Sequence, residues 1–261
     1  MVQESANSAF GKFVWYDQMS LDLAGSGAFY EKVVGWTLKA NEMNDQPYTV
    51  LTAGDAMVGG LMPIPPDAVK MGARPAWMGY VAVDDVDAYA GKVKSAGGSI
   101  YRPPSDIPNI GRFAVVGDPH GAAFIIFKGS AAMAPVHDPA KPGHFGWREL
   151  HAGDRETDFA FYSSLFGWKK TDTFDMGPMG VYQLFDIAGA MQGGMMTKMP
   201  QTPSPHWLYY INVEGADAAA ARVTAAGGKV LNGPHEVPGG QWVLQALDPQ
   251  GAMFGLVAPV K

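Results

Sequence analysis

One short segment of the chain brings two proton-transfer groups within range of each other. Glu149 and His151 are separated by a single residue in the aromatic and apolar segment FGWRELHA, residues 145–152. If this segment is a β-strand, side chains two residues apart share one face, and their backbones are about 6.6–7 Å apart. Both could then contact one ligand. The pattern predicts an acid–base or ligand-orienting pair, with burial raising the pKa of the carboxylate.

Other interpretations of this pair stay open at the level of sequence. Both side chains could lie on the outer face of the strand, or form a buried hydrogen bond with a purely structural role. A similar segment, FVWYDQMS at residues 13–20, carries Asp17, but Met19 stands where the second segment has its histidine. A structural role is therefore more strongly indicated for Asp17 than for Glu149.

The composition excludes several other kinds of site. None of the 261 residues is cysteine, so disulfides, thiolate metal sites and cysteine nucleophiles are ruled out. The phosphate-loop, HExxH and GxSxG motifs are missing from the sequence. With 19 basic and 25 acidic residues the net charge is -6, which gives no electrostatic footprint for nucleic acid. Incidental roles are expected for the remaining histidines, His120, His137, His144, His206 and His235.

A long internal repeat dominates the sequence. Residues 13–36 align with residues 145–168 without a gap, at an offset of 132 positions. Later matches have an offset of 130 positions. The matched pairs include Trp15 and Trp147, Asp22 and Asp154, Trp36 and Trp168, Trp77 and Trp207, and Asp118 and Asp248. So small a drift over so many residues indicates two duplicated domains that differ in their loops.

Each half contains a second, weaker repeat of a β-α-β-β-β pattern. In the first module, Asp22 is a predicted helix N-cap and Gly35 a predicted helix end. Further helices are predicted at 86–96 and 216–226. Strands are predicted at 13–20, 48–52, 56–62, 78–83, 123–127, 207–213 and 252–257.

Clusters of proline and glycine mark the boundaries between these modules. They predict a first domain at 8–130, with modules 8–66 and 75–130, and a linker at 131–143. A second domain follows at 144–261, with modules 144–200 and 205–261. The predicted fold is α+β, with four βαβββ modules paired into two domains. Helices on one face of each half-barrel sheet would leave the other face to enclose a small-molecule cavity.

An ordered series of short motifs, present twice, carries a family resemblance. The motifs are Phe29 to Trp36 and Phe161 to Trp168, Val83-Asp84-Asp85, the Gly-Gly helix ends, and the turns Asp118–Gly121 and Asp248–Gly251. Over nearly its whole length the chain resembles the vicinal oxygen chelate superfamily, which includes glyoxalase I, extradiol dioxygenases and bleomycin-resistance proteins. The resemblance implies the paired βαβββ fold.

The resemblance also implies where a divalent metal would be bound. Enzymes of this superfamily hold it with histidine, glutamate or glutamine from the first and last strand of each module. Counting from the motifs places these positions at Trp15, Met78, Trp147 and Leu208, at Ile125 and Gly255, and near Gly60 and Gly194. None of these residues is a useful ligand for Mg, Mn, Fe, Ni or Zn. We therefore expect no metal and no other cofactor.

Aromatic and apolar side chains are expected to line the cavities in place of metal ligands. The candidate ligand-binding residues are Trp15, Asp17, Met78, Tyr80, Trp147, Leu208 and Tyr210, and the candidate catalytic residues are Glu149 and His151. The leading hypothesis is a metal-free glyoxalase-like protein that binds a small apolar or aromatic molecule, and whether it catalyses a reaction stays open. The alternative is a metal-dependent lyase, isomerase or dioxygenase with unusual ligands such as Glu149, His151 and His206.

A third possibility is that only the second domain has a working cavity. No segment has the roughly 20 apolar residues that a membrane-spanning helix needs, so a cytoplasmic protein is expected, with no membrane or nucleic-acid partner. Covalent duplication already pairs the modules, which makes a monomer or a homodimer the expected state.

Overall fold

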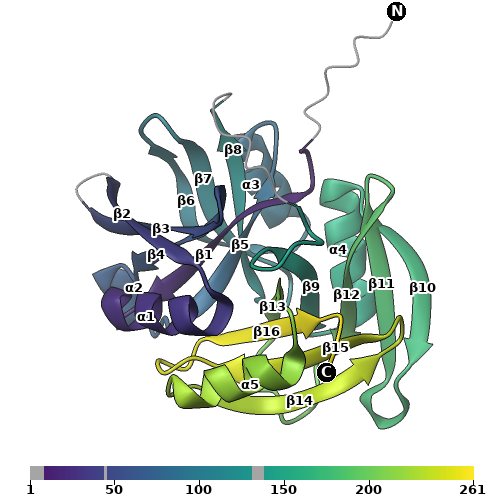
Figure 1. Ribbon diagram of the computed structural model, residues 1–261. Coiled ribbons are helices and arrows are strands. Elements are labelled where there is room, and N and C mark those ends of the chain that lie inside the picture. Colours follow the sequence, from purple (N-terminus) through teal and green to yellow (C-terminus); the bar gives the residue numbers. More distant parts are fainter. Residues whose placement is uncertain (1–8, 44–45, 131–137) are drawn as a thin grey trace, which may run out of the picture. The chain divides into compact units, whose positions relative to one another are not determined.

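The computed structural model describes residues 9–43, 46–130 and 138–261. Four βαβββ modules follow one another along the chain (Figure 1). The first module contains β1 (Phe13–Ser20), α1 (Leu23–Val34), β2 (Thr37–Met43), β3 (Gln46–Ala53) and β4 (Ala56–Pro63), and is followed by α2 (Pro66–Lys70). The second contains β5 (Ala76–Ala82), α3 (Val86–Ser95), β6 (Ser99–Ile107), β7 (Gly111–Gly117) and β8 (Ala123–Gly129).

The second half of the chain repeats this order. The third module contains β9 (Phe145–Ala152), α4 (Arg155–Phe166), β10 (Lys169–Asp175), the 3-10 turn η1 (Gly177–Met179), β11 (Val181–Ile187) and β12 (Ala190–Thr197). The fourth contains β13 (His206–Asn212), α5 (Ala216–Ala225), β14 (Lys229–Val237), β15 (Gln241–Leu247) and β16 (Met253–Ala258). The α+β fold of repeated βαβββ modules is thereby confirmed. Residues 131–137 of the predicted linker lie outside the described residues.

Each half of the chain forms one mixed sheet. The strand orders are β2-β3-β4-β1-β5-β8-β7-β6 and β10-β11-β12-β9-β13-β16-β15-β14. In every module the first strand pairs in parallel with the last, as in β1 with β4 and β9 with β12, whereas the other pairs within a module are antiparallel. This parallel pairing places the first-strand and last-strand residues of a module side by side.

Local sequence signals start and stop the helices as predicted. Asp22 accepts a hydrogen bond from the Gly25 amide at the start of α1, and Asp154 caps α4 in the same way. Gly35 ends α1 and Gly167 ends α4, with φ angles of 87° and 72°. A side chain is strained in this left-handed conformation, which explains why glycine occupies both positions.

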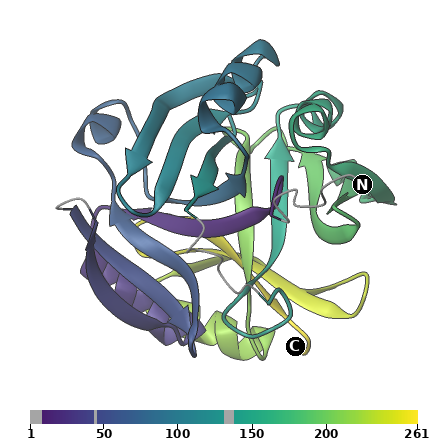
Figure 2. The same cartoon turned by 90° about the horizontal axis from the view of Figure 1, so that it is seen from above.

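The helices cover one face of their own strands. α5 packs on β14–β16, and α1 lies along the strands of the first module (Figures 1 and 2). On β1, Ser20 points toward α1, where its hydroxyl lies 3.0 Å from that of Ser26. Because side chains alternate along a strand, Trp15, Asp17 and Met19 are on the face opposite the helix.

The chain divides into two compact units, each built from modules of both halves. One unit contains α3 and β6–β8 together with α4 and β10–β12. The other contains α1 and β2–β4 together with α5 and β14–β16. Each unit therefore combines elements that are far apart in the sequence.

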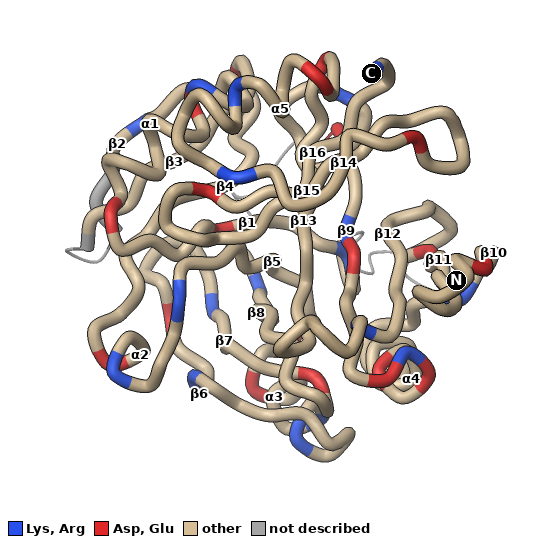
Figure 3. The backbone as a smooth tube through the Cα atoms, turned by 90° about the horizontal axis from the view of Figure 1, so that it is seen from below, with Lys and Arg blue, Asp and Glu red and all other residues tan. Residues whose placement is uncertain are grey.

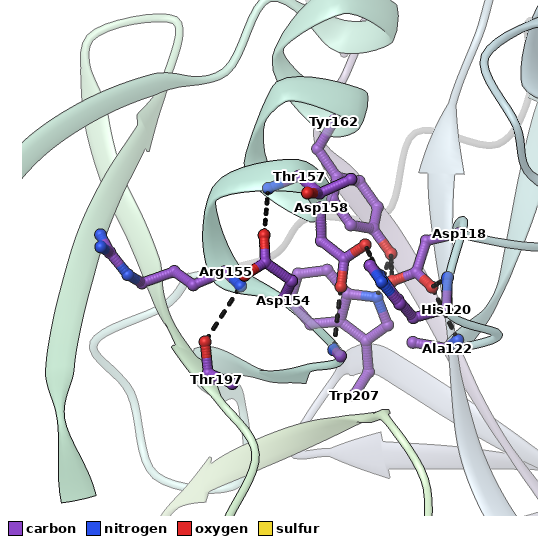
Figure 4. A network of polar contacts seen from close by, with 11 residues as sticks. Asp118, His120, Ala122, Asp154, Arg155, Thr157, Asp158, Tyr162, Thr197 and Trp207 are labelled. Atoms are coloured by element: carbon purple, nitrogen blue, oxygen red, sulfur yellow. Dashed lines mark hydrogen bonds and ion pairs between the residues drawn. The ribbon is translucent and has the colours of Figure 1, made fainter.

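The same three residue types form a buried hydrogen-bonded chain in both units. In the first unit, Trp207 Nε1 donates to the Tyr162 hydroxyl at 2.9 Å, and Tyr162 donates to Asp118 at 3.2 Å (Figure 4). In the second, Trp77 donates to Tyr30 at 2.8 Å, and Tyr30 donates to Asp248 at 3.2 Å. These residues are among the repeated ones in the sequence, so the repeat reflects a polar network inside each core.

The two units differ beside this network. In the first unit His120 Nδ1 lies 2.6 Å from Asp158, which also accepts a hydrogen bond from the Gly153 amide (Figure 4). In the second unit Gln250 occupies the position equivalent to His120. Its side-chain amide oxygen accepts hydrogen bonds from the backbone of Leu21 and Asp22. An ionisable pair in one unit thus corresponds to a neutral amide in the other.

Burial and proximity shift the titration of the first network. Burial, followed by the charge of Asp158, raises the pKa of Asp118 to about 6. Burial also raises the pKa of Asp158, whereas the hydrogen bond to Asp158 raises the pKa of His120. All three groups bind protons more tightly in the folded state, so this unit gains stability as the pH falls.

Charged residues of both signs are interspersed over the chain (Figure 3). On α4, for example, Arg155 and Glu156 form an ion pair, and Lys170 on β10 also pairs with Glu156. Within the described ranges, no helix combines the length and the apolar character needed to cross a membrane.

We predict that His120→Gln flattens the pH dependence of stability above about pH 6.5. The raised pKa of His120 means that its stabilising contribution is present below the unfolded-state pKa and is lost as the pH rises through the folded-state pKa. Urea unfolding at a series of pH values between about 6.5 and 8 measures this loss. The matched control is His235→Gln, which changes an exposed histidine. Equal slopes in His120→Gln and the wild type would contradict the prediction.

Candidate functional site

The two residues predicted to act together are in direct contact on β9. Glu149 Oε1 and His151 Nε2 lie 2.8 Å apart, and the two side chains are only 11% and 12% exposed. A carboxylate accepts hydrogen bonds, so the imidazole donates from Nε2. The bond fixes the orientation of the His151 ring and leaves Nδ1 as its other functional atom.

A tyrosine two strands away in the sheet holds the second oxygen of the same carboxylate. The Tyr182 hydroxyl, on β11, donates to Glu149 Oε2 at 2.9 Å. Between β9 and β11 runs β12, where Gly194 is the register partner of Glu149. A Cβ atom at Gly194 would lie 2.2 Å from the Tyr182 ring. Glycine at this position therefore provides the space through which the tyrosine reaches Glu149.

A second imidazole stacks on His151. His206, the first residue of β13, has its ring centroid 4.7 Å from that of His151, with an angle of 6° between the planes. Its Nδ1 lies 3.0 Å from the Ser204 carbonyl oxygen. Burial lowers the pKa of His206. Within the described part of the chain, His151 Nδ1 and His206 Nε2 are buried atoms with no hydrogen-bond partner.

The first module repeats the carboxylate–tyrosine–glycine arrangement without the histidines. Tyr48 donates to Asp17 Oδ1 at 2.7 Å, and Gly60 is the register partner of Asp17. A Cβ at Gly60 would lie 2.0 Å from the Tyr48 oxygen. Met19 occupies the place of His151. The first module thus has a buried carboxylate, but not the adjacent imidazole.

The structure brings some of the predicted cavity residues together. Trp147 packs against a buried cluster of Leu208, Tyr210 and Val257, as do the partly buried Val243 and Met253. Tyr80 packs edge-on against Phe127, with ring centroids 5.7 Å apart. Trp15 and Met78 lie partly buried on β1 and β5. The roles of these residues in ligand binding stay predictions.

Sequence reasoning missed Tyr182, which belongs to no recognisable motif. His206 was expected to be incidental because no histidine-pair spacing includes it, and only the metal-dependent alternative grouped it with Glu149 and His151. The available signal was glycine at the last-strand position of three modules, at Gly60, Gly194 and Gly255. A side chain missing from the same position three times indicates a large neighbour that needs the space.

The side chains at the expected metal positions do not fit the metal that the fold implies. Phenol groups fill the space above Gly60 and Gly194, and the Tyr210 ring fills the space above Gly255. Both oxygens of Glu149 already accept hydrogen bonds, from His151 and Tyr182. Across the described ranges, no group of three or more histidine, aspartate or glutamate side chains is arranged to hold a metal ion.

Comparison with known proteins identifies the family. A sequence model of the Glyoxalase/Bleomycin resistance protein/Dioxygenase superfamily matches residues 12–126 and again residues 141–256. The chain belongs to this superfamily. The two matches correspond to the two repeated domains, so the vicinal oxygen chelate resemblance and the duplication are both confirmed.

Two relatives within the superfamily match along nearly their whole length. "Putative glyoxylase CFP32" of Mycobacterium tuberculosis (strain CDC 1551 / Oshkosh) is 32% identical, and the match covers 94% of each chain. "Anthracycline biosynthesis protein DauV" of Streptomyces sp. (strain C5) is 31% identical, with 95% of this chain and 93% of DauV covered.

Solved structures with much lower sequence identity share the fold. The Mn(II)-bound glyoxalase from Novosphingobium aromaticivorans matches with a TM-score of 0.62 and 18% identity, covering 95% of this chain and 81% of that one. The 2,3-dioxygenase LapB from Pseudomonas sp. KL28 gives a TM-score of 0.62 at 12% identity, covering 94% and 90%.

We predict that Gly194→Ala destabilises the protein by about 1–3 kcal/mol, because the new methyl group overlaps the Tyr182 ring. Gly91→Ala is the matched control, since a Cβ at that helical position meets no neighbouring atom within 4 Å. Urea unfolding of both variants measures the difference. If the clash is the cause, Gly194→Ala should lower the free energy of unfolding much less in a Tyr182→Ala background than in the wild type. An equal loss in both backgrounds would contradict this explanation.

Proposed function

We propose that this superfamily member binds a small, mostly apolar or aromatic molecule beside β9, where Glu149 and His151 orient the ligand or transfer a proton. One observation carries the proposal. A buried imidazole is hydrogen-bonded to a carboxylate through one nitrogen, while its other nitrogen has no partner among the described residues.

This arrangement is suited to acid–base chemistry. The Glu149 carboxylate accepts the Nε2 proton of His151 and so directs Nδ1 away from the carboxylate, where it can exchange a proton or a hydrogen bond with a ligand. Tyr182 keeps the carboxylate in place by holding its other oxygen. The role of Glu149 is thus to position and support His151, whose Nδ1 is the atom proposed to meet the ligand.

Nearby apolar groups support the choice of ligand. Trp147 precedes Glu149 by two residues on β9 and so shares its face of the strand. Trp147 also packs with Leu208 and Tyr210. Such side chains bind aromatic molecules through apolar burial, at about 25 cal/mol per Å², and through ring stacking. A relative whose name refers to anthracycline biosynthesis accords with an aromatic ligand.

The second candidate is a metal-dependent lyase, isomerase or dioxygenase of the same superfamily with ligands such as Glu149, His151 and His206, whose side chains would have to rearrange because the described residues include no ready group of three ligands. The two imidazole nitrogens without partners favour it, because neutral imidazole is a common metal ligand. Metal binding to the native state must raise the melting temperature. If Ni²⁺, Zn²⁺, Mn²⁺ and Fe²⁺ all leave it unchanged, this candidate is rejected.

We predict that Glu149→Gln weakens the binding of the aromatic probe 2-naphthol by about tenfold or more, since it removes the charge that supports His151. Trp147→Ala should weaken it as well by removing apolar contact. Asp17→Asn is the matched control, because it makes the same change at the equivalent carboxylate of the first module and should leave the affinity within about twofold. Isothermal titration calorimetry measures all four proteins. Equal effects of Glu149→Gln and Asp17→Asn would contradict the assignment of the site, and so would a wild type that does not bind the probe.

A further inference from the structure

We infer that the ligand presents a hydrogen-bond donor, such as a phenolic or enolic hydroxyl group, to His206 Nε2, with His151 Nδ1 as a second buried acceptor on the adjacent ring. The inference rests on the proposed function, because it concerns the same site, and it goes further by specifying the chemistry of the group that binds there. It follows from the hydrogen bonds that the two rings already make.

The tautomer of His206 is set by its backbone contact. Its Nδ1 faces the carbonyl oxygen of Ser204 at 3.0 Å. A carbonyl oxygen can only accept a hydrogen bond, so the proton is on Nδ1. Burial lowers the pKa of His206 and so favours its neutral form, in which the contact of Nδ1 with Ser204 leaves the lone pair on Nε2. The partnerless atom of His206 is therefore an acceptor.

The same reasoning applies to His151. Its Nε2 faces the Glu149 carboxylate at 2.8 Å, so Nε2 carries a proton. In the neutral ring Nδ1 is then an acceptor as well. The other polar groups of the cluster are already engaged, since Tyr182 donates to Glu149. The two buried atoms that have no hydrogen bond here both need a donor.

Two neighbouring acceptors cannot satisfy each other. The rings are stacked 4.7 Å apart and nearly parallel, and a buried acceptor without a partner costs about 1–3 kcal/mol. A ligand hydroxyl would recover part of this cost, whereas an ether or carbonyl oxygen would face a lone pair. Since both atoms are shielded, the ligand must shift a side chain to reach them, and His206 is only partly buried at the start of its strand.

This inference is tested with two probes that differ only in whether they carry a hydrogen-bond donor. The naphthalene ring is common to 2-naphthol and 2-methoxynaphthalene, but the methyl ether cannot donate. We expect the wild type to bind 2-naphthol about tenfold more tightly, the ratio that one net hydrogen bond provides. His206→Phe keeps an aromatic ring for stacking but removes the acceptor, so the ratio should fall to about threefold or less. His235→Phe, at an exposed histidine, should retain the wild-type ratio.

The outcomes separate the inference from the proposed function. If the wild type binds both probes equally and Glu149→Gln still weakens binding, the site stands and the donor requirement is wrong. If neither probe binds, both are overturned. Zn²⁺ added without a probe is a further test. If it raises the melting temperature of the wild type but not of His206→Phe, the lone pairs bind a cation and the inference is overturned.

A second measurement uses only the wild-type protein, so it does not depend on whether a variant folds. In wild-type protein with ¹⁵N-labelled histidine, the Nε2 resonance of His206 should move toward the protonated-nitrogen range when 2-naphthol is added, and should stay in place with 2-methoxynaphthalene. A shift of equal size with both probes would contradict the inference.

Discussion

In each module the first and last strands pair in parallel, and this pairing decides which side chains lie next to each other on the face opposite the helices. It puts Glu149 beside Gly194 and Asp17 beside Gly60. With glycine on the last strand, a tyrosine from the next strand crosses over and bonds to the carboxylate. A carboxylate that is buried and bonded in this way is held in one orientation and is already engaged, so metal coordination of the family type does not fit these positions. The available polar chemistry then belongs to the imidazoles that only the third and fourth modules supply.

Duplication explains why the modules are alike and why equivalent positions now carry different side chains. Each compact unit retains the Trp–Tyr–Asp hydrogen bonds, which satisfy large polar side chains inside an apolar core. Differences accumulate beside these networks. One unit has the ionisable pair His120–Asp158, and the other has the neutral Gln250. The carboxylates show the same divergence, because Glu149 has His151 two residues later whereas Asp17 has Met19. Equivalent positions in a duplicated fold thus provide natural controls for each other.

Local sequence was sufficient for most of the secondary structure. The predicted strand at 13–20 is β1, and the helix predicted to begin after Asp22 and end at Gly35 is α1. These elements are readable because caps, turns and alternation act over a few residues. The contact between Glu149 and His151 was predictable for the same reason, since a strand places side chains two apart on one face. The contact of Tyr182 with Glu149 was not predictable, because Tyr182 reaches the site from another strand, 33 residues away in the sequence. The stacking of His206 on His151 was not predictable either, although the metal-dependent alternative named both residues.

The sequence by itself determined the fourfold module, the duplication and the proximity of one carboxylate to one imidazole, because these depend on periodicity and on short-range geometry. Only the tertiary structure decided which atoms of that pair remain without partners. That outcome depends on strand register, which sets Gly194 beside Glu149, and on the approach of β11 and β13, which bring Tyr182 and His206 to the pair. Register and strand order are long-range properties of the folded chain. They place Glu149 and His151 in a cluster whose remaining acceptor atoms need a hydrogen-bond donor.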